Sequence, residues 1–508
     1  MEEKKIPLKQ LVEERLKKLK KLRELGIEPF GYRFERTHKI KEIRERYEKI
    51  KAGKKLEKVK VKVAGRIKAI RIHGKASFAD LEDENGRIQL FFSLGSLGKK
   101  KYSIFKELID IGDIIGVRGF IFKTQKGELS IWVRDFTLLA KSLRPLPKEW
   151  YGLKDVKIRY TQRYLDLLMN RKVRERFILI SKLINAMREF LISKGFVEVD
   201  TPALQTVYGG AFAKPFETYH NYLKQKMYLR IAPELHLKRL LVGGLEKVFE
   251  LAKCFRNESV DVSHNPEFLQ LELYQAYANY EDTMKLVEEM IYWVAKKIGR
   301  AKVEYQGKKI NLKPPWKRIP MVKAIKKYGK IDVLSLSDDE LKKIAKENEI
   351  EKVRRGEIIE ALFEKLVQPK LIQPTFITLF PADITPLAKK AKDPRFAERY
   401  EGYIGGIEIC NGYTELNNPI EQFKRFEEEE ELRKRFKELE FMPMDRDFIR
   451  ALEYGMPPAS GVGIGIARIA SIFTNTTSIK EVIAFPTVSG KEKILVIPDL
   501  IPESRKFG

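Results

Sequence analysis

Residues 254–274 have the sequence CFRNESVDVSHNPEFLQLELY, which predicts two strands joined by a loop that carries an arginine and a histidine. Successive side chains of a strand point to opposite faces, so one face of the second strand is expected to carry four chemically useful side chains. These are Phe268, Gln270, Glu272 and Tyr274. A glutamate on a buried face is costly unless a cation pairs with it. The stretch therefore indicates either a binding site or a salt bridge inside a sheet.

Two further stretches lie downstream. Residues 400–419 have the sequence YEGYIGGIEICNGYTELNNP, in which glutamates recur at steps of seven: Glu401, Glu408 and Glu415. On a hairpin these carboxylates would converge, and convergent carboxylates without His or Cys favour Mg²⁺ over zinc. Residues 461–469 have the sequence GVGIGIARI. Alternating glycines predict a strand that lets a ligand or another backbone approach closely, although such strands also serve packing.

The N-terminal third has a different pattern. Apolar periodicity predicts a helix over residues 7–25, and residues 1–60 hold 21 basic and 11 acidic residues. This charge run is consistent with a solvated face, but it favours an arm that contacts phosphates. From about residue 59 to 140, five short β-rich runs separated by turns predict a closed barrel of the OB-fold type. For Phe91 and Phe92 we prefer a place in the barrel core, whereas bases stack on exposed aromatics in such barrels.

Length and composition narrow the class of protein. A chain of 508 residues predicts two to four domains at about 150 residues per domain. Lys and Arg number 99 against 71 Asp and Glu, and the net charge of +28 indicates a polyanionic partner more than a thermophile's ion-paired surface. No apolar run is long enough to span a membrane, and no signal-peptide core begins the chain. Two widely spaced cysteines, Cys254 and Cys410, predict a cytoplasmic protein without a zinc site.

Together, and in this order, the stretches resemble the class II lysyl-tRNA synthetases over essentially the whole chain. GFVEVDTP (195–202), FRNES with HNPEF (255–268) and GVGIGIAR (461–468) are similar to motifs 1, 2 and 3 of that class. LRIAPELHLKRL (229–240) and NGYTELN (411–417) are similar to the lysine branch in particular. The resemblance implies a multidomain α+β fold, with an anticodon-binding domain at 1–142 (basic helix, then an OB-fold at about 59–140), a linker at 143–157, and a catalytic domain at 158–508. The catalytic domain would hold an antiparallel sheet and a helical insertion at about 335–370.

The resemblance also implies a reaction and its partners. A homodimer would activate L-lysine with ATP to lysyl-adenylate and pyrophosphate, and transfer the lysine to the terminal ribose of tRNA(Lys). The residues implied for catalysis are Arg256, His264 and Arg468; for ATP, Arg256, Glu258, His264, Phe268, Glu401, Glu408 and Arg468, with Mg²⁺ on Glu401 and Glu408. Those implied for lysine are Gly210, Glu234, Arg256, Glu272, Tyr274, Asn411 and Glu415, and those for the anticodon are Arg71, Phe78, Gln89 and Glu128.

Three positions, Ala467, Asn418 and Ser263, depart from the family pattern, and the first is the main departure. Ala467 stands where the family usually has an acidic residue, directly before Arg468. The departure leaves open a non-catalytic RNA-binding protein built on a degenerate synthetase. A third reading is an enzyme that lysylates a protein, as some relatives do, but those relatives lack the barrel domain that this chain retains.

Overall fold

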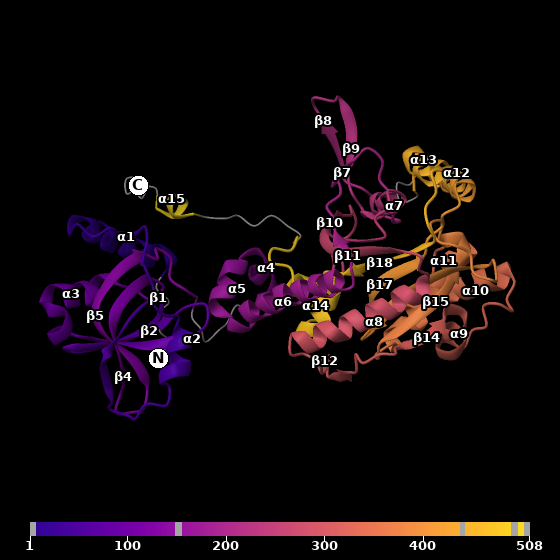
Figure 1. Cartoon of the computed structure of the whole chain (residues 1–508). Coiled ribbons are helices and arrows are strands. Elements are labelled where there is room, and N and C mark those ends of the chain that lie inside the picture. Colours follow the sequence, from indigo (N-terminus) through magenta and orange to yellow (C-terminus); the bar gives the residue numbers. More distant parts are fainter. Residues whose placement is uncertain (1–6, 148–154, 437–441, 489–495, 502–508) are drawn as a thin grey trace. The chain divides into compact units, whose positions relative to one another are not determined.

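The computed structural model describes residues 7–147, 155–436, 442–488 and 496–501 (Figure 1). The chain divides into two compact units, one of residues 1–152 with 490–508 and the other of residues 153–489. Residues 148–154 of the expected linker at 143–157 lie outside the described residues. No helix in the described part of the chain is both long and apolar enough to cross a membrane.

The first unit is a closed five-stranded barrel with flanking helices. Its strands are ordered β1-β2-β3-β5-β4, so the predicted OB-fold is confirmed. Its elements are α1 (Leu8–Glu24), α2 (Ile40–Tyr47), β1 (Lys55–His73), β2 (Ala76–Glu82), β3 (Arg87–Ser93), α3 (Leu94–Leu108), β4 (Ile114–Lys123) and β5 (Leu129–Ala140). The helix predicted over 7–25 is α1, which buries Val12, Leu16, Leu19 and Leu22 at the spacing of one helical face. The short helix α15 (Ile497–Leu500) belongs to this unit, and Ile501 packs against α1.

Burial alternates along the barrel strands and decides where the aromatic residues lie. In β3 the buried residues are Ile88, Leu90 and Phe92, which point into the barrel. Phe91 therefore points to the opposite face, where its ring contacts that of Phe78 at 5.1 Å between centroids. The core assignment of Phe92 agrees with this geometry, but that of Phe91 is wrong, because the two residues are neighbours in a strand of period two.

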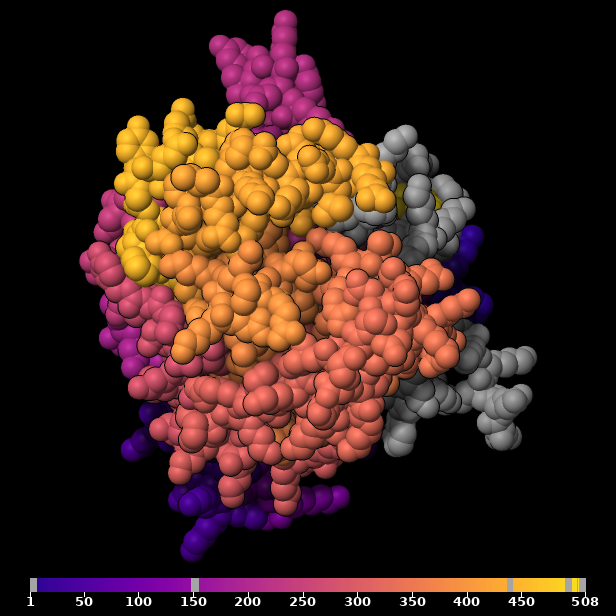
Figure 2. Space-filling model, turned by 90° about the vertical axis from the view of Figure 1, so that its right-hand side faces the viewer, coloured from indigo at the N-terminus to yellow at the C-terminus, as the bar shows by residue number. Residues whose placement is uncertain are grey.

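The second unit is built on an eight-stranded sheet. The strand order is β14-β15-β16-β17-β18-β11-β10-β6, antiparallel except for the parallel pairs β14–β15 and β10–β6 at the two edges. The sheet strands are β6 (Val197–Glu198), β10 (Lys247–Phe255), β11 (Glu267–Ala276), β14 (Lys317–Pro320), β15 (Thr375–Pro381), β16 (Phe396–Ile404), β17 (Ile407–Thr414) and β18 (Ala459–Gly465). Small accessory strands are β7 (Leu204–Gln205), β8 (Glu217–His220), β9 (Gln225–Leu229), β12 (Val303–Tyr305) and β13 (Lys308–Ile310). The β8–β9 hairpin projects from the surface of this unit (Figure 2).

Helices cover one face of this sheet and leave the other available for a site. The helices are α4 (Val156–Thr161), α5 (Arg163–Met169), α6 (Arg171–Ser193), α7 (Glu234–Val242), α8 (Tyr280–Lys297), α9 (Met321–Ala324), α10 (Asp338–Glu347), α11 (Arg355–Leu366), α12 (Pro419–Phe436), α13 (Arg446–Glu453) and α14 (Ile466–Thr474). Side chains of α6, α8 and α14 form one apolar core with Leu271 and Leu273 of β11 and Val462 and Ile464 of β18. The alternate residues of β11 and β18 therefore face away from this core.

The helical insertion predicted at about 335–370 corresponds to α10 and α11. A capping box begins α10, because the Ser337 hydroxyl accepts from the Glu340 amide at 3.3 Å and the Glu340 carboxylate accepts from the Ser337 amide at 2.8 Å. The insertion forms its own apolar core around Leu362 and Phe363 of α11.

Candidate active site

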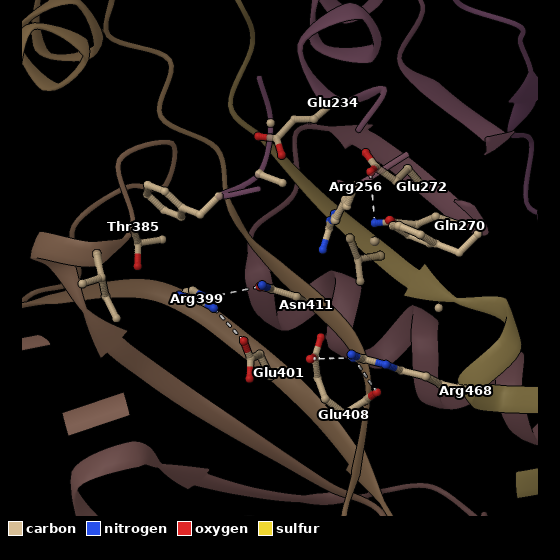
Figure 3. Close-up of a pocket in the computed structure, with 18 of the residues that line it drawn as sticks. Glu234, Arg256, Gln270, Glu272, Thr385, Arg399, Glu401, Glu408, Asn411 and Arg468 are labelled. Carbon is tan, nitrogen blue, oxygen red and sulfur yellow. Dashed lines mark hydrogen bonds and ion pairs between the residues drawn. The ribbon is translucent and has the colours of Figure 1, made fainter. Parts of the chain in front are cut away.

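A cavity of about 600 Å³ lies on the face of the eight-stranded sheet that α6 and α8 leave open. Strands β11, β16, β17 and β18 contribute its floor, and α7, α11 and the loop between β10 and β11 contribute its walls. Figure 3 shows acidic residues at both ends, with Glu234 and Glu272 at one and Glu401 and Glu408 at the other. Arg256 and Asn411 lie between these ends.

The register of β11 against β18 makes room for the side chains on the cavity floor. Gln270, Glu272 and Tyr274 lie opposite Gly465, Gly463 and Gly461, respectively. A Cβ atom at Gly461 would lie 2.2 Å from Cε1 of Tyr274, and one at Gly463 would lie 2.4 Å from Nε2 of Gln270. The glycines of this strand therefore admit side chains of the neighbouring strand, as the sequence pattern indicated.

Buried acids and tyrosines form one end of the cavity. The Glu272 carboxylate accepts hydrogen bonds from Tyr274 at 3.0 Å and from Gln270 at 3.1 Å. Burial raises the pKa of Glu272 to about 8, and the charge of Glu234 adds to this rise. Glu234 begins α7 and accepts a hydrogen bond of 2.5 Å from the Tyr413 hydroxyl. This end is therefore suited to a ligand that carries positive charge.

Arg256 is the cation at the middle of the cavity. Its guanidinium lies 5.0 Å from the ring centre of Phe268, and its Nε finds no hydrogen-bond partner among the described residues. A half-buried guanidinium whose Nε is buried without an acceptor suits an anionic ligand. Gly210, also in the cavity wall, has a φ of 84°, and a Cβ atom there would lie 2.8 Å from Cβ of Glu234. The backbone of Gly210 thus lies directly beside that acid.

The opposite end combines two carboxylates with two arginines. Arg399 donates to Glu401 at 2.6 Å and to Asn411 at 3.2 Å, and Arg468 donates to Glu408 at 2.7 Å (Figure 3). Burial raises the pKa of Glu401 to about 8, although Arg399 opposes the rise. Burial also acts to raise the pKa of Glu408, but Arg468 outweighs it and the pKa lies below the ordinary value.

A register shift in the hairpin aims Glu408 at this end of the cavity. Glu401 pairs with Asn411, but a shift between Gly402 and Tyr403 brings Tyr403 opposite Glu408. In a regular strand Glu408 and Asn411, three positions apart, would point to opposite faces. The bulge lets both line one cavity, which is a common use of such irregularities next to functional sites.

The loop between β10 and β11 supplies the more exposed residues of the cavity. Glu258 and His264 of this loop line the cavity together with Phe268 at the start of β11, and Nδ1 of His264 lies 2.8 Å from the Asp261 carboxylate. Asp261 also accepts the backbone amides of Ser263 and His264 at 2.7 and 2.8 Å. The loop is thus folded around Asp261.

Glu415 does not converge with Glu401 and Glu408, so that part of the hairpin prediction is wrong. It follows β17, where the chain runs away from the bulge, and it is fully buried behind the wall that Gly461 and Tyr274 form. Its carboxylate lies 2.5 Å from Nζ of Lys238 on α7. Burial raises the pKa of Glu415 to about 8 against the opposing charge of Lys238.

In the barrel unit, the four residues expected to bind an anticodon lie on neighbouring strands. Arg71 lies opposite Phe78, and Phe78 lies opposite Phe91. Gln89 lies opposite Asp80, two pairs along the same two strands, and accepts a hydrogen bond from Ser130 at 3.0 Å. Glu128 directly precedes β5. The pKa of Arg71 is raised mainly by its hydrogen bond to Asp80, and the charge of Glu128 adds a smaller rise. Phe91, Phe122 and Trp132 extend the aromatic surface around Phe78.

Sequence reasoning missed several residues of the cavity. Arg399 was detectable, since it alternates with Glu401 along one strand. The contribution of α11 was not, because Glu357, Glu360 and Glu364 reach the cavity only through the packing of the insertion on the sheet. Lys238, which lies behind the cavity wall, was not identified either. Nothing in the mixed composition of α7 indicates that its lysine is buried.

Comparisons with known proteins agree with both units. Residues 155–489 match the family described as tRNA synthetases class II (D, K and N), and residues 61–139 match the OB-fold nucleic acid binding domain. The lysine–tRNA ligase of Carboxydothermus hydrogenoformans is 51% identical over 492 residues, which cover 96% of this chain and 99% of that protein. The lysine–tRNA ligase of Moorella thermoacetica is 52% identical over 94% of this chain and 98% of its own length. The lysine–tRNA ligase of Thermotoga maritima is 48% identical over 96% of this chain and 97% of that protein.

Proposed function

The chain belongs to the class II tRNA synthetases, among the lysine–tRNA ligases, and from this membership we infer that it joins L-lysine to tRNA(Lys) in an ATP-dependent reaction. The observation that carries the inference is a single cavity with buried acids at one end, two carboxylate–arginine pairs at the other, and Arg256 between them. Lysine, which has an ammonium group at each end and a carboxylate beside one of them, fits the first end together with Arg256, and a triphosphate fits the second.

Lysine carries an ammonium group at each end of its chain, so its site needs two sets of acids. We assign the α-ammonium to Glu234 and the carbonyl of Gly210, and the carboxylate to Arg256 and Asn411. Glu272 and Tyr274 would hold the side-chain ammonium, with Glu415 behind them. Because an unpaired buried carboxylate costs several kcal/mol, neutral amino acids are rejected strongly.

The nucleotide would occupy the end formed by the arginines and the exposed loop. Arg256 would bridge the lysine carboxylate and the α-phosphate, since its planar fork can donate to both. Phe268 and Arg468 would hold the adenine ring between them, with Glu258 at its edge and His264 beside the triphosphate.

The chemistry then depends on position and charge. The lysine carboxylate is already ionised, so it needs no general base when its oxygen bonds to the α-phosphorus and the bond to pyrophosphate breaks. Arg256 and Arg468 offset the repulsion between the two anionic reactants. A ribose hydroxyl at the end of the tRNA next attacks the activated carbonyl, and AMP leaves.

Glu401 and Glu408 are the residues that would hold Mg²⁺. Among the residues described, no cluster of three or more acidic, histidine or cysteine side chains is arranged to hold a metal by itself. Two carboxylates fit Mg²⁺ nonetheless, because this ion commonly takes one or two carboxylates and completes its shell with substrate phosphates and water. When bound, Mg²⁺ would neutralise phosphate charge.

The partners follow from the two units. We propose that the aromatic face around Phe78, with Arg71, Gln89 and Glu128, contacts the anticodon of the tRNA. A net charge of +28 favours binding of this polyanion. The protein would act as a homodimer in the cytosol, where its tRNA substrate is found.

Lysine-dependent exchange of pyrophosphate into ATP tests the catalytic half of this proposal. The protein should catalyse exchange with lysine and not with alanine or norleucine, and it should charge tRNA(Lys). Absence of exchange at saturating ATP and lysine would leave only an RNA-binding function.

That second function is motivated by Ala467. The residue packs against an apolar cluster that includes Ile180, Ile479 and Val482, while Glu408 holds the neighbouring Arg468 through both its side chain and its carbonyl oxygen. Because Arg468 already has this partner, we expect Ala467→Asp to change the exchange rate by less than about tenfold, the effect of one charged hydrogen bond. A larger gain would mean that the native chain is catalytically impaired at this position.

A further inference from the structure

Lys238 is a fully buried ammonium group that the reaction described above does not use. It lies one helical turn after Glu234 on α7, and its side chain is 0% exposed. Its Nζ lies 2.6 Å from Oε1 of Glu234 and 2.5 Å from Oε2 of Glu415. The rings of Tyr413 and Phe448 lie 5.3 and 5.9 Å from the same nitrogen. The ammonium is therefore held between two acids and two aromatic rings.

The charges at this end of the cavity do not balance without a ligand. Among the described residues, this end holds three buried carboxyl groups, those of Glu234, Glu272 and Glu415, and the ammonium of Lys238, which pairs with the first and the third. The other buried acid nearby, Glu250, is paired with Arg230 at 2.6 Å. If the three carboxyl groups and the ammonium group of Lys238 are all ionised, two negative charges remain without a partner. Free lysine carries the same number of ammonium groups.

The surrounding groups fix this arrangement. Tyr413 of β17 donates to Glu234, and Tyr274 of β11 donates to Glu272. Burial lowers the pKa of Lys238, but the charges of Glu234 and Glu415 outweigh burial and raise it above the ordinary value. Lys238 consequently keeps its charge in the empty cavity.

We propose that Lys238 is a positioning and specificity-determining residue that sets the negative charge of the lysine pocket to match a dication. It acts through Glu234 and Glu415, and it does not contact the substrate. Lys238 and the Tyr413 hydroxyl together hold the Glu234 carboxylate in place. A pocket with one negative charge more or one fewer fits lysine less well. The inference rests on the proposed lysine site.

Three variants test this charge balance through the KM values for lysine and ATP in pyrophosphate exchange. Lys238→Met keeps the side-chain length and adds one unpaired acid, and Glu415→Gln removes one acid. Each should raise the lysine KM by roughly tenfold or more with little change in the ATP KM. In Lys238→Met two buried carboxyl groups lose their charged partner, and in Glu415→Gln the buried ammonium group of Lys238 loses one of its two acids. The double variant Lys238→Met/Glu415→Gln restores the native net charge, so its lysine KM should return to within a few-fold of the parent value.

The double variant is the decisive measurement. A lysine KM equal to or above that of the worse single variant would overturn the proposal, because Glu415 would then contact lysine directly and Lys238 would be scaffold only. An unchanged lysine KM in Lys238→Met, or parallel rises in both KM values, would also overturn it. If Lys238→Met alone does not fold, the lysine KM of Glu415→Gln can still be compared with that of the double variant. The proposal requires the lower KM in the double variant.

A matched control is available on the same helix. Arg239 pairs with Asp445 at 2.8 and 3.0 Å on the side of α7 that faces α13, so Arg239→Met removes a comparable ion pair away from the cavity. Arg239→Met should lower thermal stability. Any change in its KM for lysine should be matched by a similar change in its KM for ATP. Failure of the proposed function is distinguishable, because the parent protein would then show no lysine-dependent exchange at all.

Discussion

Glu272 carries the buried carboxyl group that we propose binds the side-chain ammonium of lysine. Its hydrogen-bond donors are the neutral side chains of Gln270 and Tyr274, and no described residue forms an ion pair with it. We expect Glu272→Gln to raise the lysine KM roughly 10- to 100-fold, the range of a hydrogen bond to a charged group, and to leave the ATP KM little changed. Exchange rates measured against each substrate in turn give both constants. Equal rises would place Glu272 outside the lysine site.

The pKa of the same group predicts a dependence on pH. Burial raises the pKa of Glu272 to about 8, so at neutral pH the empty site holds a proton that an incoming ammonium must displace. The lysine KM of the parent protein should therefore fall as the pH rises from about 6.5 to 8. In Glu272→Gln the fall should be shallower, though not absent, because burial raises the pKa of Glu415 to a similar value. An identical slope in both proteins would contradict this assignment.

At the scale of elements, the pairing of β11 with β18 shapes the pocket. The glycines of β18 lie under the side chains of β11, and Gly461 has the least room, with Tyr274 and Glu415 both in the path of a Cβ atom. We expect Gly461→Ala to displace Tyr274 and raise the lysine KM at least tenfold, with a stability loss of about 1–3 kcal/mol as for other overpacked sites. Thermal unfolding and exchange kinetics measure the two effects.

Gly465→Ala on the same strand is the matched control. A Cβ atom there would meet its nearest neighbour, Cδ of Arg468, at 3.4 Å, which is an ordinary contact. The lysine KM of this variant should stay within a few-fold of the parent value. Similar losses in both variants would mean that β18 needs glycine for its backbone and not for the side chains of β11.

Local periodicity explains which elements could be predicted from the sequence. Strand alternation was enough to place Phe268, Glu272 and Tyr274 on one face, and helical spacing was enough to define α1. The bulge that aims Glu408 into the cavity could not be foreseen, since it arises from the pairing of β16 with β17. The separation of Glu415 from the other hairpin acids could not be foreseen either. Equal spacing in the sequence does not show that β17 carries the chain away from the bulge before it reaches Glu415.

Tertiary packing explains why the sequence did not identify Lys238 and the residues of α11. Lys238 is buried only because α7 packs against β17 and α13, and α11 reaches the cavity only because the insertion folds back onto the sheet. The resemblance to a known family supplied the roles of residues such as Asn411, which composition and spacing alone did not indicate.

At the scale of the whole molecule, the two units are expected to divide the work. Phe78→Ala should raise the KM for tRNA(Lys) in charging roughly 5- to 100-fold, since one base stacked on an aromatic ring contributes about 1–3 kcal/mol. Lysine-dependent exchange, which needs no tRNA, should stay at the parent rate. Tyr32→Ala is the matched control, because Tyr32 is an exposed aromatic residue of the same unit outside the barrel face. A loss of exchange in Phe78→Ala would contradict this division.

The edge of the eight-stranded sheet is where we expect a second copy of the chain to bind. Strand β6 pairs with β10 and is the last strand of the sheet, and its Val197 is 49% exposed. Ile178 and Ile192 of the adjacent α6 are also exposed, so apolar side chains gather beside a free strand edge. The double variant Ile192→Asp/Val197→Asp should therefore be monomeric in light scattering, whereas Val353→Asp, at an exposed residue of the insertion, should remain dimeric. Since β10 leads directly from this edge to Arg256, we expect the monomer to lose most of its exchange activity as well. A variant that stays dimeric would place the interface elsewhere, and a monomeric parent protein would contradict the homodimer itself.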